Sequence, residues 1–131
     1  MNIGDIVQIN YKQIGYTSAE YITAGIGIII RGGVAQGEPT NDQNESKKNI
    51  WQKFYEANLD DLRESGESRT TLILRYTLSH PNADTNIVGT MNSKHLSENV
   101  AGIMKGPLNK DTYLELKRRM DSVGINASPV I

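Results

Sequence analysis

The chain has 131 residues, enough for one domain of ordinary size, and 37% of them are hydrophobic and 22% charged. The formal net charge of −1 argues against a broad nucleic-acid-binding surface, which needs clustered lysine and arginine. Without cysteine the chain has no disulfides and no thiolate metal sites, and its two histidines, His80 and His95, are too few for a typical catalytic zinc site.

Two strands are predicted in the first third of the chain. Residues 5–11, DIVQINY, are rich in β-branched side chains. Residues 26–31, IGIIIR, are apolar without alternation, as in a strand that is buried on both faces of a parallel sheet. Only a short helical piece, 18–24, is indicated between them, and the polar residues 36–48 predict an exposed loop.

The middle of the chain predicts two helices and a third strand. A helix over 49–63 would place Ile50, Phe54 and Leu62 near one face, with Trp51 and Leu59 close by. A second helix, 70–80, should end before Pro81, because a residue that precedes proline disfavours the helical conformation. A short strand over 85–89 follows.

Two further helices complete the chain. The helix over 93–105 carries Leu96, Val100, Ile103 and Met104 on one face and ends at Gly106-Pro107. The last helix begins after Asn109 and ends at Gly124. It is expected to bury Leu116, Met120 and Val123 and to present Lys117-Arg118-Arg119, the only basic cluster, as a solvated face.

Strands that alternate with helices predict an α/β fold with a parallel sheet and right-handed crossovers. Only three strands are visible, which is few for a sheet buried on both faces. The chain, residues 1–131, is therefore expected to be a single domain that corresponds to part of a larger α/β barrel.

The cellular location follows from what the sequence lacks. No apolar run approaches the roughly 20 residues that a membrane-spanning helix needs. The first residues lack the basic start and apolar core of a signal peptide. We expect a cytoplasmic protein that binds neither membranes nor nucleic acid.

Four stretches resemble the C-terminal portion of the aldo/keto reductases, a family of NAD(P)H-dependent oxidoreductases. They are DIVQINY at 5–11, GIGIIIRGGVAQG at 25–37, RTTLILRYTLSHPNADTNIVGTMNSKHLSENV at 69–100 and GPLNKDTYLEL at 106–116. The resemblance implies a partial (β/α)8 TIM barrel with strands six, seven and eight and their helices.

The resemblance also implies a cofactor site after the last strand, which holds the adenosine end of NADP in this family. Gly89 and Thr90 would let the backbone approach the cofactor, and Asn92 and Ser93 would cap the helix and face a phosphate. The pair Glu98-Asn99 would reach the adenine. Read from the residues alone, Asn92 is an ordinary N-cap and Glu98-Asn99 are exposed polar residues.

Earlier positions add to the implied site. Gln8 matches the strand-six glutamine that binds the nicotinamide carboxamide, although a buried structural glutamine is the alternative. Arg31 falls where many members stack a tyrosine on the nicotinamide, and an arginine plane can also stack. Gly32, Gly33 and Val34 would offer backbone N–H groups to the pyrophosphate.

The preference between NADP and NAD stays open in the sequence. Some family members have cationic residues where this chain has Gly89, Met91 and His95, and those cations bind the 2′-phosphate. Lys94 is the one nearby lysine that can substitute. NADPH is the expected cofactor, and NAD the alternative.

Catalysis in the family needs an Asp, a Tyr, a Lys and a His from earlier strands, and this chain has no match to them. No catalytic residue is therefore assigned. Three interpretations remain: a portion of a reductase with part of its cofactor site, a non-catalytic module that binds a dinucleotide or self-associates, and one half of a split enzyme. An open sheet edge predicts low stability for the first.

Overall fold

The structure is a computed structural model that describes residues 6–10, 27–31, 37–39, 45–81 and 83–125. Within them lie three strands, β1 (Ile6–Asn10), β2 (Gly27–Arg31) and β3 (Thr85–Ile87). There are four α-helices, α1 (Glu45–Glu56), α2 (Arg69–Leu78), α3 (Ser93–Met104) and α4 (Lys110–Ser122), in these described residues. A 3-10 helix, η2 (Leu59–Leu62), follows α1. The fold is mixed α/β and mostly helical. The predicted short helix at 18–24 lies outside the described residues.

The strands form a parallel sheet, as the sequence predicted, and their order is β1-β2-β3. Ile6 to Asn10 pair in register with Gly27 to Arg31, and Ile29 to Arg31 pair with Thr85 to Ile87. β3 is shorter than the predicted 85–89. Ile30 of the middle strand is 2% exposed, whereas Ile87 on the outer strand β3 is 51% exposed.

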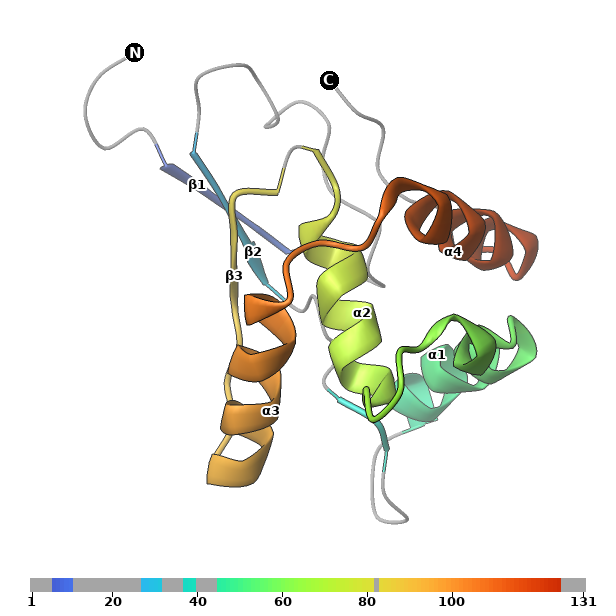
Figure 1. Cartoon of the computed structure of the whole chain (residues 1–131), viewed down its shortest axis with the longest axis horizontal. Helices are drawn as coiled ribbons and strands as arrows, with labels where there is room; N and C mark the ends of the chain where they lie inside the picture. The colour runs from blue at the N-terminus through green and yellow to red at the C-terminus, as the bar shows by residue number, and fades with distance from the viewer. Residues whose placement is uncertain (1–5, 11–26, 32–36, 40–44, 82, 126–131) are drawn as a thin grey trace.

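Helix α2 lies at the centre of the molecule, with the sheet and α3 on one side and α1 and α4 on the other (Figure 1). Ser68 caps its N-terminus by accepting a hydrogen bond from the backbone N–H of Thr71. Its last residue is Leu78, so the predicted stop before His80-Pro81 is confirmed. Because α2 is covered on both sides, all residues from Thr71 to Thr77 are buried.

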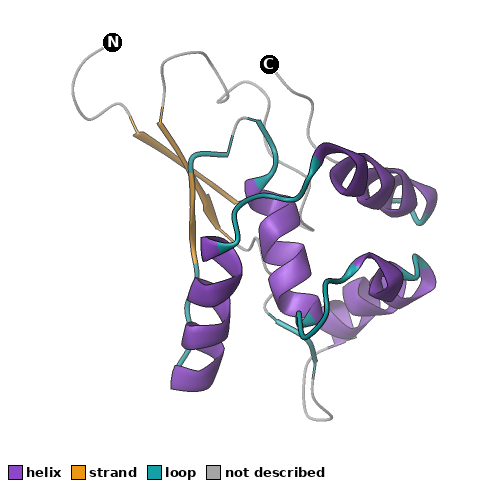
Figure 2. Ribbon diagram, viewed as in Figure 1, coloured by secondary structure: helices purple, strands orange, loops and turns teal. Residues whose placement is uncertain are grey.

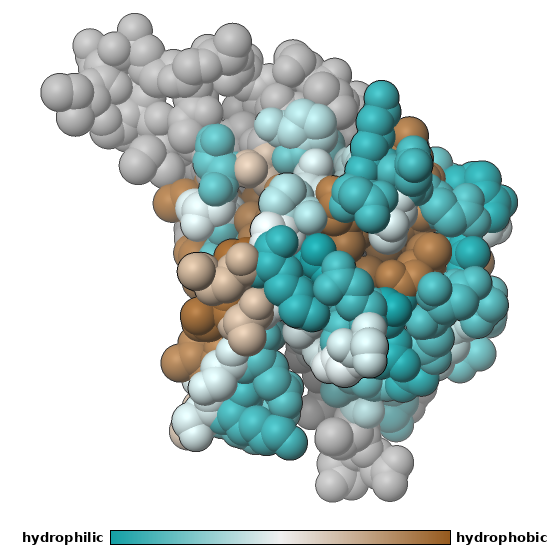
Figure 3. All heavy atoms as spheres, in the orientation of Figure 1, coloured by the Kyte–Doolittle hydropathy of each residue, from teal (hydrophilic) through white to brown (hydrophobic). Residues whose placement is uncertain are grey.

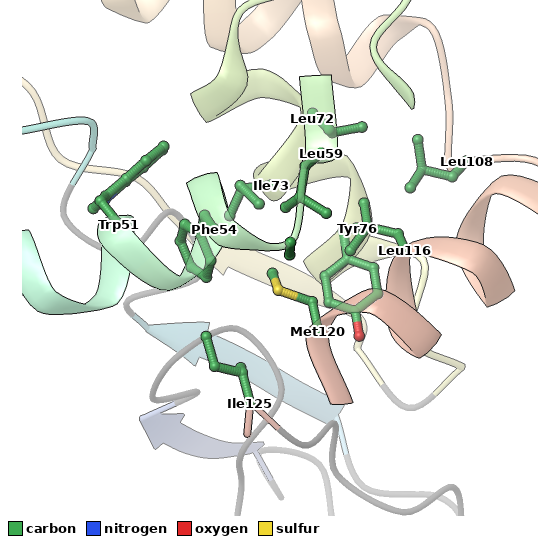
Figure 4. Close-up of a cluster of buried hydrophobic side chains, with 11 residues drawn as sticks. Trp51, Phe54, Leu59, Leu72, Ile73, Tyr76, Leu108, Leu116, Met120 and Ile125 are labelled. Atoms are coloured by element: carbon green, nitrogen blue, oxygen red, sulfur yellow. The ribbon is translucent and has the colours of Figure 1, made fainter. Parts of the chain in front are cut away.

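The main hydrophobic core lies between the helices rather than on the sheet (Figure 4). It joins Trp51 and Phe54 of α1, Leu72 and Tyr76 of α2, and Leu116 and Met120 of α4, among others. Trp51 and Phe54 meet edge to face with ring centroids 5.1 Å apart. Among the side chains that the structure describes, none from the sheet or from α3 belongs to this cluster.

The predicted helix 49–63 is wrong at both ends. α1 begins at Glu45, within the predicted loop 36–48, and ends at Glu56. Asn58 then adopts a left-handed conformation with φ 52°, which an asparagine tolerates better than most residues. The break lets the short helix η2 turn Leu59 back into the core.

Helices α3 and α4 match their predicted ranges, but they differ in what they bury. α4 is capped by Asn109, ends before Gly124 at φ 83°, and buries Leu116 and Met120. Val123 is only partly buried against the core. In α3 the buried residues are Asn99 and Gly102, so its predicted apolar face is exposed.

In the basic cluster of α4, Arg118 is exposed and Lys117 and Arg119 are partly exposed, and all three pair with acids of the same or a neighbouring element. Lys117 Nζ lies 2.9 Å from Asp121, and Arg118 lies 2.7 Å from Glu115. Arg119 binds Glu115 and reaches Asp61 in η2. The expectation of a solvated helix face is confirmed for Lys117 and Arg118, while Arg119 also ties α4 to η2.

Candidate functional site

The turn between β3 and α3 is the element to which the sequence assigned most of the site. Figure 2 shows this segment as a loop between the strand and the helix. The residues from Gly89 through Glu98 are exposed. The hydroxyl of Thr90 accepts a hydrogen bond from the backbone N–H of Asn92 at 3.1 Å. The Asn92 side chain in turn accepts from the backbone N–H of Lys94 at 2.9 Å, so the predicted N-cap is confirmed.

These two bonds limit what the helix start can offer to a ligand. The free N–H groups of a first turn and the helix dipole favour an anion. Here the N–H groups of Asn92 and Lys94 are already satisfied by side chains of the turn itself. A bound phosphate would use other groups of this exposed turn or displace one of these bonds.

Gly89 has no structural reason within the described residues to be a glycine. Its φ is not positive, and a Cβ atom placed on it would meet no atom within 4 Å. Gly106 and Gly124, in contrast, both have φ above 80° at helix ends. The space beside Gly89 is thus open to an approaching group.

The strand register brings the predicted residues of different strands to one edge of the sheet. Arg31, the last residue of β2, pairs with Ile87, the last residue of β3, so the chain leaves both strands side by side. Gln8 pairs with Ile29, two residues before that edge. Gly32, Gly33 and Val34 lie outside the described residues.

Glu98 and Asn99, the two residues predicted to reach the adenine, lie in different hollows on either side of α3. Glu98 lines a polar cleft of about 620 Å³ between α3 and the segment from Asp60 to Thr71. Its carboxylate lies 3.9 Å from Lys94 Nζ. Asn99, only 9% exposed, lines an apolar groove of about 310 Å³ between α2, β3 and α3. The two side chains therefore do not share one pocket.

The polar cleft was not anticipated from the sequence. Glu64 and Lys105 face each other across it at 3.1 Å. Hydrogen bonds from Arg75 and then from Lys105 lower the pKa of the Glu64 carboxyl below its ordinary value. The charge-rich run DDLRESGE, 60–67, was the available signal. The charges that line the cleft pair with one another or with neighbouring residues, and the pair of Glu64 with Lys105 joins the loop before α2 to the end of α3.

Within the part of the chain that the structure describes, the two histidines do not form a metal site with other residues. His95 is exposed in the first turn of α3, while His80 is 4% exposed after α2. Across the described residues no group of three or more His, Cys, Asp or Glu side chains is arranged to hold a metal ion. Over the same part of the chain, none of the helices has the length and apolar character required to cross a membrane.

Comparisons of the chain with protein-family models, with curated proteins and with solved structures gave no match.

Proposed function

We propose that the chain is the C-terminal, cofactor-binding portion of an aldo/keto reductase, equivalent to strands six to eight of a (β/α)8 barrel, and that it binds NADPH without catalysing a reaction alone. The observation that carries the proposal is the register of the parallel sheet. Because of this register, Arg31 at the end of β2 and the turn that begins at Gly89 after β3 lie at the same edge of the sheet.

In parallel α/β folds, ligands bind at the carboxyl ends of the strands. The turn at that edge is exposed and carries Gly89, for which neither the backbone nor the packing requires a glycine. A dinucleotide phosphate that approaches the backbone there would explain why position 89 is a glycine. Gln8 and Arg31 would contribute from β1 and β2, and Thr90, Asn92 and Ser93 from the turn.

Fewer side chains of the proposed site can contact the adenine than the resemblance implies. Asn99 lies in the apolar groove and Glu98 in the polar cleft, so one adenine ring cannot contact both side chains in this arrangement. The exposed Glu98 is the member of the pair that stays accessible beside Lys94. We therefore place the adenine on the Glu98 side.

A thermal melt with and without saturating NADPH tests the proposal. A ligand that binds only the folded state stabilises it by about 2.7 kcal/mol at 100 times its Kd. We expect a cooperative transition whose midpoint NADPH raises and NADH raises less. A midpoint that is indifferent to both cofactors would overturn the proposal.

A matched pair of substitutions separates the cofactor site from helix stability. Asn92→Asp and Asn109→Asp each add one negative charge at the cap of a helix, and aspartate caps as well as asparagine. Because a carboxylate repels phosphate, N92D should lose the NADPH shift, while N109D should keep it. Equal shifts in the two variants would place the cofactor elsewhere.

A further inference from the structure

Helix α3 presents two flanks of opposite character. On one flank Gly102 packs so closely against α2 that an added Cβ would lie 2.2 Å from the Thr71 methyl group. On the other, Leu96, Val100 and Met104 are 50%, 55% and 81% exposed. Figure 3 shows apolar side chains gathered along the edge of the molecule where β3 and α3 lie. α2 thus fixes α3 with its apolar flank facing outward.

The exposed apolar residues are concentrated in one segment. Six of the eight large apolar side chains that are exposed in the described residues lie between Ile87 and Met104. Four of them, Leu96, Val100, Ile103 and Met104, line the groove of about 310 Å³, which Leu74 and Leu78 of α2 also line. Monomeric soluble proteins rarely expose so contiguous an apolar surface, which instead marks an interaction site.

Charged residues are almost absent from this face. Among the described residues, Asp84, just before β3, is the only charged one that lines the groove. Of the charges on α3, Glu98 and Lys105 line the polar cleft on the opposite flank, and Lys94 pairs with Glu98. With one charged residue in the groove of each copy, the face meets little electrostatic penalty when it packs against its own copy.

We propose that this face is a homodimer interface, in which the α3 helices of two copies pack antiparallel across a two-fold axis. Leu96, Val100 and Ile103 follow one another at intervals of four and three residues, the spacing of a two-helix seam. A two-fold interface uses the same patch on both subunits, which a neutral apolar stripe satisfies.

The overall charge agrees with a second copy as the occupant. A net charge of −1 gives little long-range repulsion between copies. In the antiparallel arrangement the two Asp84 carboxylates would lie at opposite ends of the seam. The inference does not rest on the proposed cofactor function, since the turn from Gly89 to Ser93 precedes the seam at Leu96, and Glu98 lines the polar cleft on the other flank of α3.

Light scattering coupled to size-exclusion chromatography on the full chain tests this inference. We expect twice the chain mass of 14.5 kDa for the wild type. Val100→Glu should reduce it to the monomer mass, because it places two carboxylates in an apolar seam. Leu114→Glu, the same kind of change at a site of α4 that is 49% exposed, should remain dimeric.

Cysteine cross-linking gives a second readout that does not depend on disrupting the interface. The chain has no cysteine, so Val100→Cys introduces a single thiol near the proposed axis. With a mild oxidant, V100C should form covalent dimers rapidly, and Leu114→Cys should not. A monomeric wild type, a dimer that survives V100E, equal cross-linking of the two cysteine variants, or a mass well above two chains would each overturn the inference.

The same variants keep the two proposals distinguishable. A monomeric V100E that still gains stability from NADPH would support the interface and the cofactor site separately. If the wild type is a dimer that does not respond to NADPH, only the cofactor proposal fails.

Discussion

Arg75 Nη1 donates a hydrogen bond to Glu67 Oε2 at 2.6 Å, and the two side chains are 4% and 0% exposed. The same guanidinium donates to Glu64 at 2.9 Å and to the carbonyl oxygen of Gly106 at 3.0 Å. One buried arginine of α2 therefore connects the loop that precedes this helix with the turn between α3 and α4. A charge buried in this way stays favourable only while its partners are in place.

Replacing Arg75 by methionine should destabilise the fold strongly. It leaves the Glu67 carboxylate buried without its counterion, and breaking one side of a buried pair costs about 3–5 kcal/mol. Urea unfolding followed by circular dichroism measures the loss. The double variant Arg75→Met/Glu67→Gln should recover part of it, because no unpaired charge remains.

Arg118→Met is the control for that experiment, since Arg118 is an exposed partner of Glu115. Its unfolding midpoint should stay close to that of the wild type. Equal midpoints for R75M and R118M would show that the buried pair contributes nothing measurable.

The second prediction concerns the contact between α3 and α2. In an unobstructed helix, Gly→Ala stabilises by about 1 kcal/mol. At Gly102 the added methyl group would lie 2.2 Å from Thr71 Cγ2, so we expect the opposite sign, a loss of about 1–3 kcal/mol. Urea unfolding of Gly102→Ala beside Ser97→Ala, an exposed site of α3, measures it. A stabilised G102A would mean that the two helices are farther apart.

The third prediction is a pH dependence at low pH. Hydrogen bonds from Arg118 and then Arg119 lower the pKa of Glu115 from 4.5 to about 2. A carboxyl with a depressed folded pKa stabilises the fold above its unfolded pKa, and that stabilisation is lost as the pH falls from 4.5 towards 2.

Thermal melts of wild type and Glu115→Gln across this pH range check the prediction. The difference between the two midpoints should be largest at neutral pH and vanish near pH 2. A difference that does not change with pH would rule out the proposed ion pairs as its source.

The fourth prediction concerns Tyr55, whose hydroxyl donates to Glu38 at 2.8 Å. Partial burial and this hydrogen bond raise its pKa from 10.0 to about 12. Because the folded pKa is raised, the associated stabilisation is complete below pH 10 and is lost as the pH rises towards 12. Burial also raises the pKa of Tyr113, so an absorbance titration should show more than one late phenolate step, and Tyr55→Phe should remove one of them.

Glu38→Gln supplies the control for Tyr55. It removes the charged acceptor but keeps the ring in place, so the late step should move back towards pH 10. An unchanged titration would mean that burial alone sets the pKa.

Local signals in the sequence predicted the elements well where they were specific. Asn109 and Gly124 mark the two ends of α4, and His80-Pro81 marks the end of α2. These signals are reliable because caps and proline act on the adjacent backbone. The helix expected at 49–63 failed because its apolar spacing continues past Asn58, where the backbone turns left-handed. Apolar spacing alone cannot locate such a break.

The sequence by itself determined the parallel sheet and the cap at Asn92, because side-chain type and spacing act locally, whereas the order of the strands came from the structure. Only the tertiary structure decided that Glu98 and Asn99 lie in different hollows and that the apolar face of α3 is exposed. A helix has the same apolar stripe whether or not a neighbour covers it. Which stripe is covered depends on distant contacts, such as that of Gly102 with Thr71, which residue spacing does not encode.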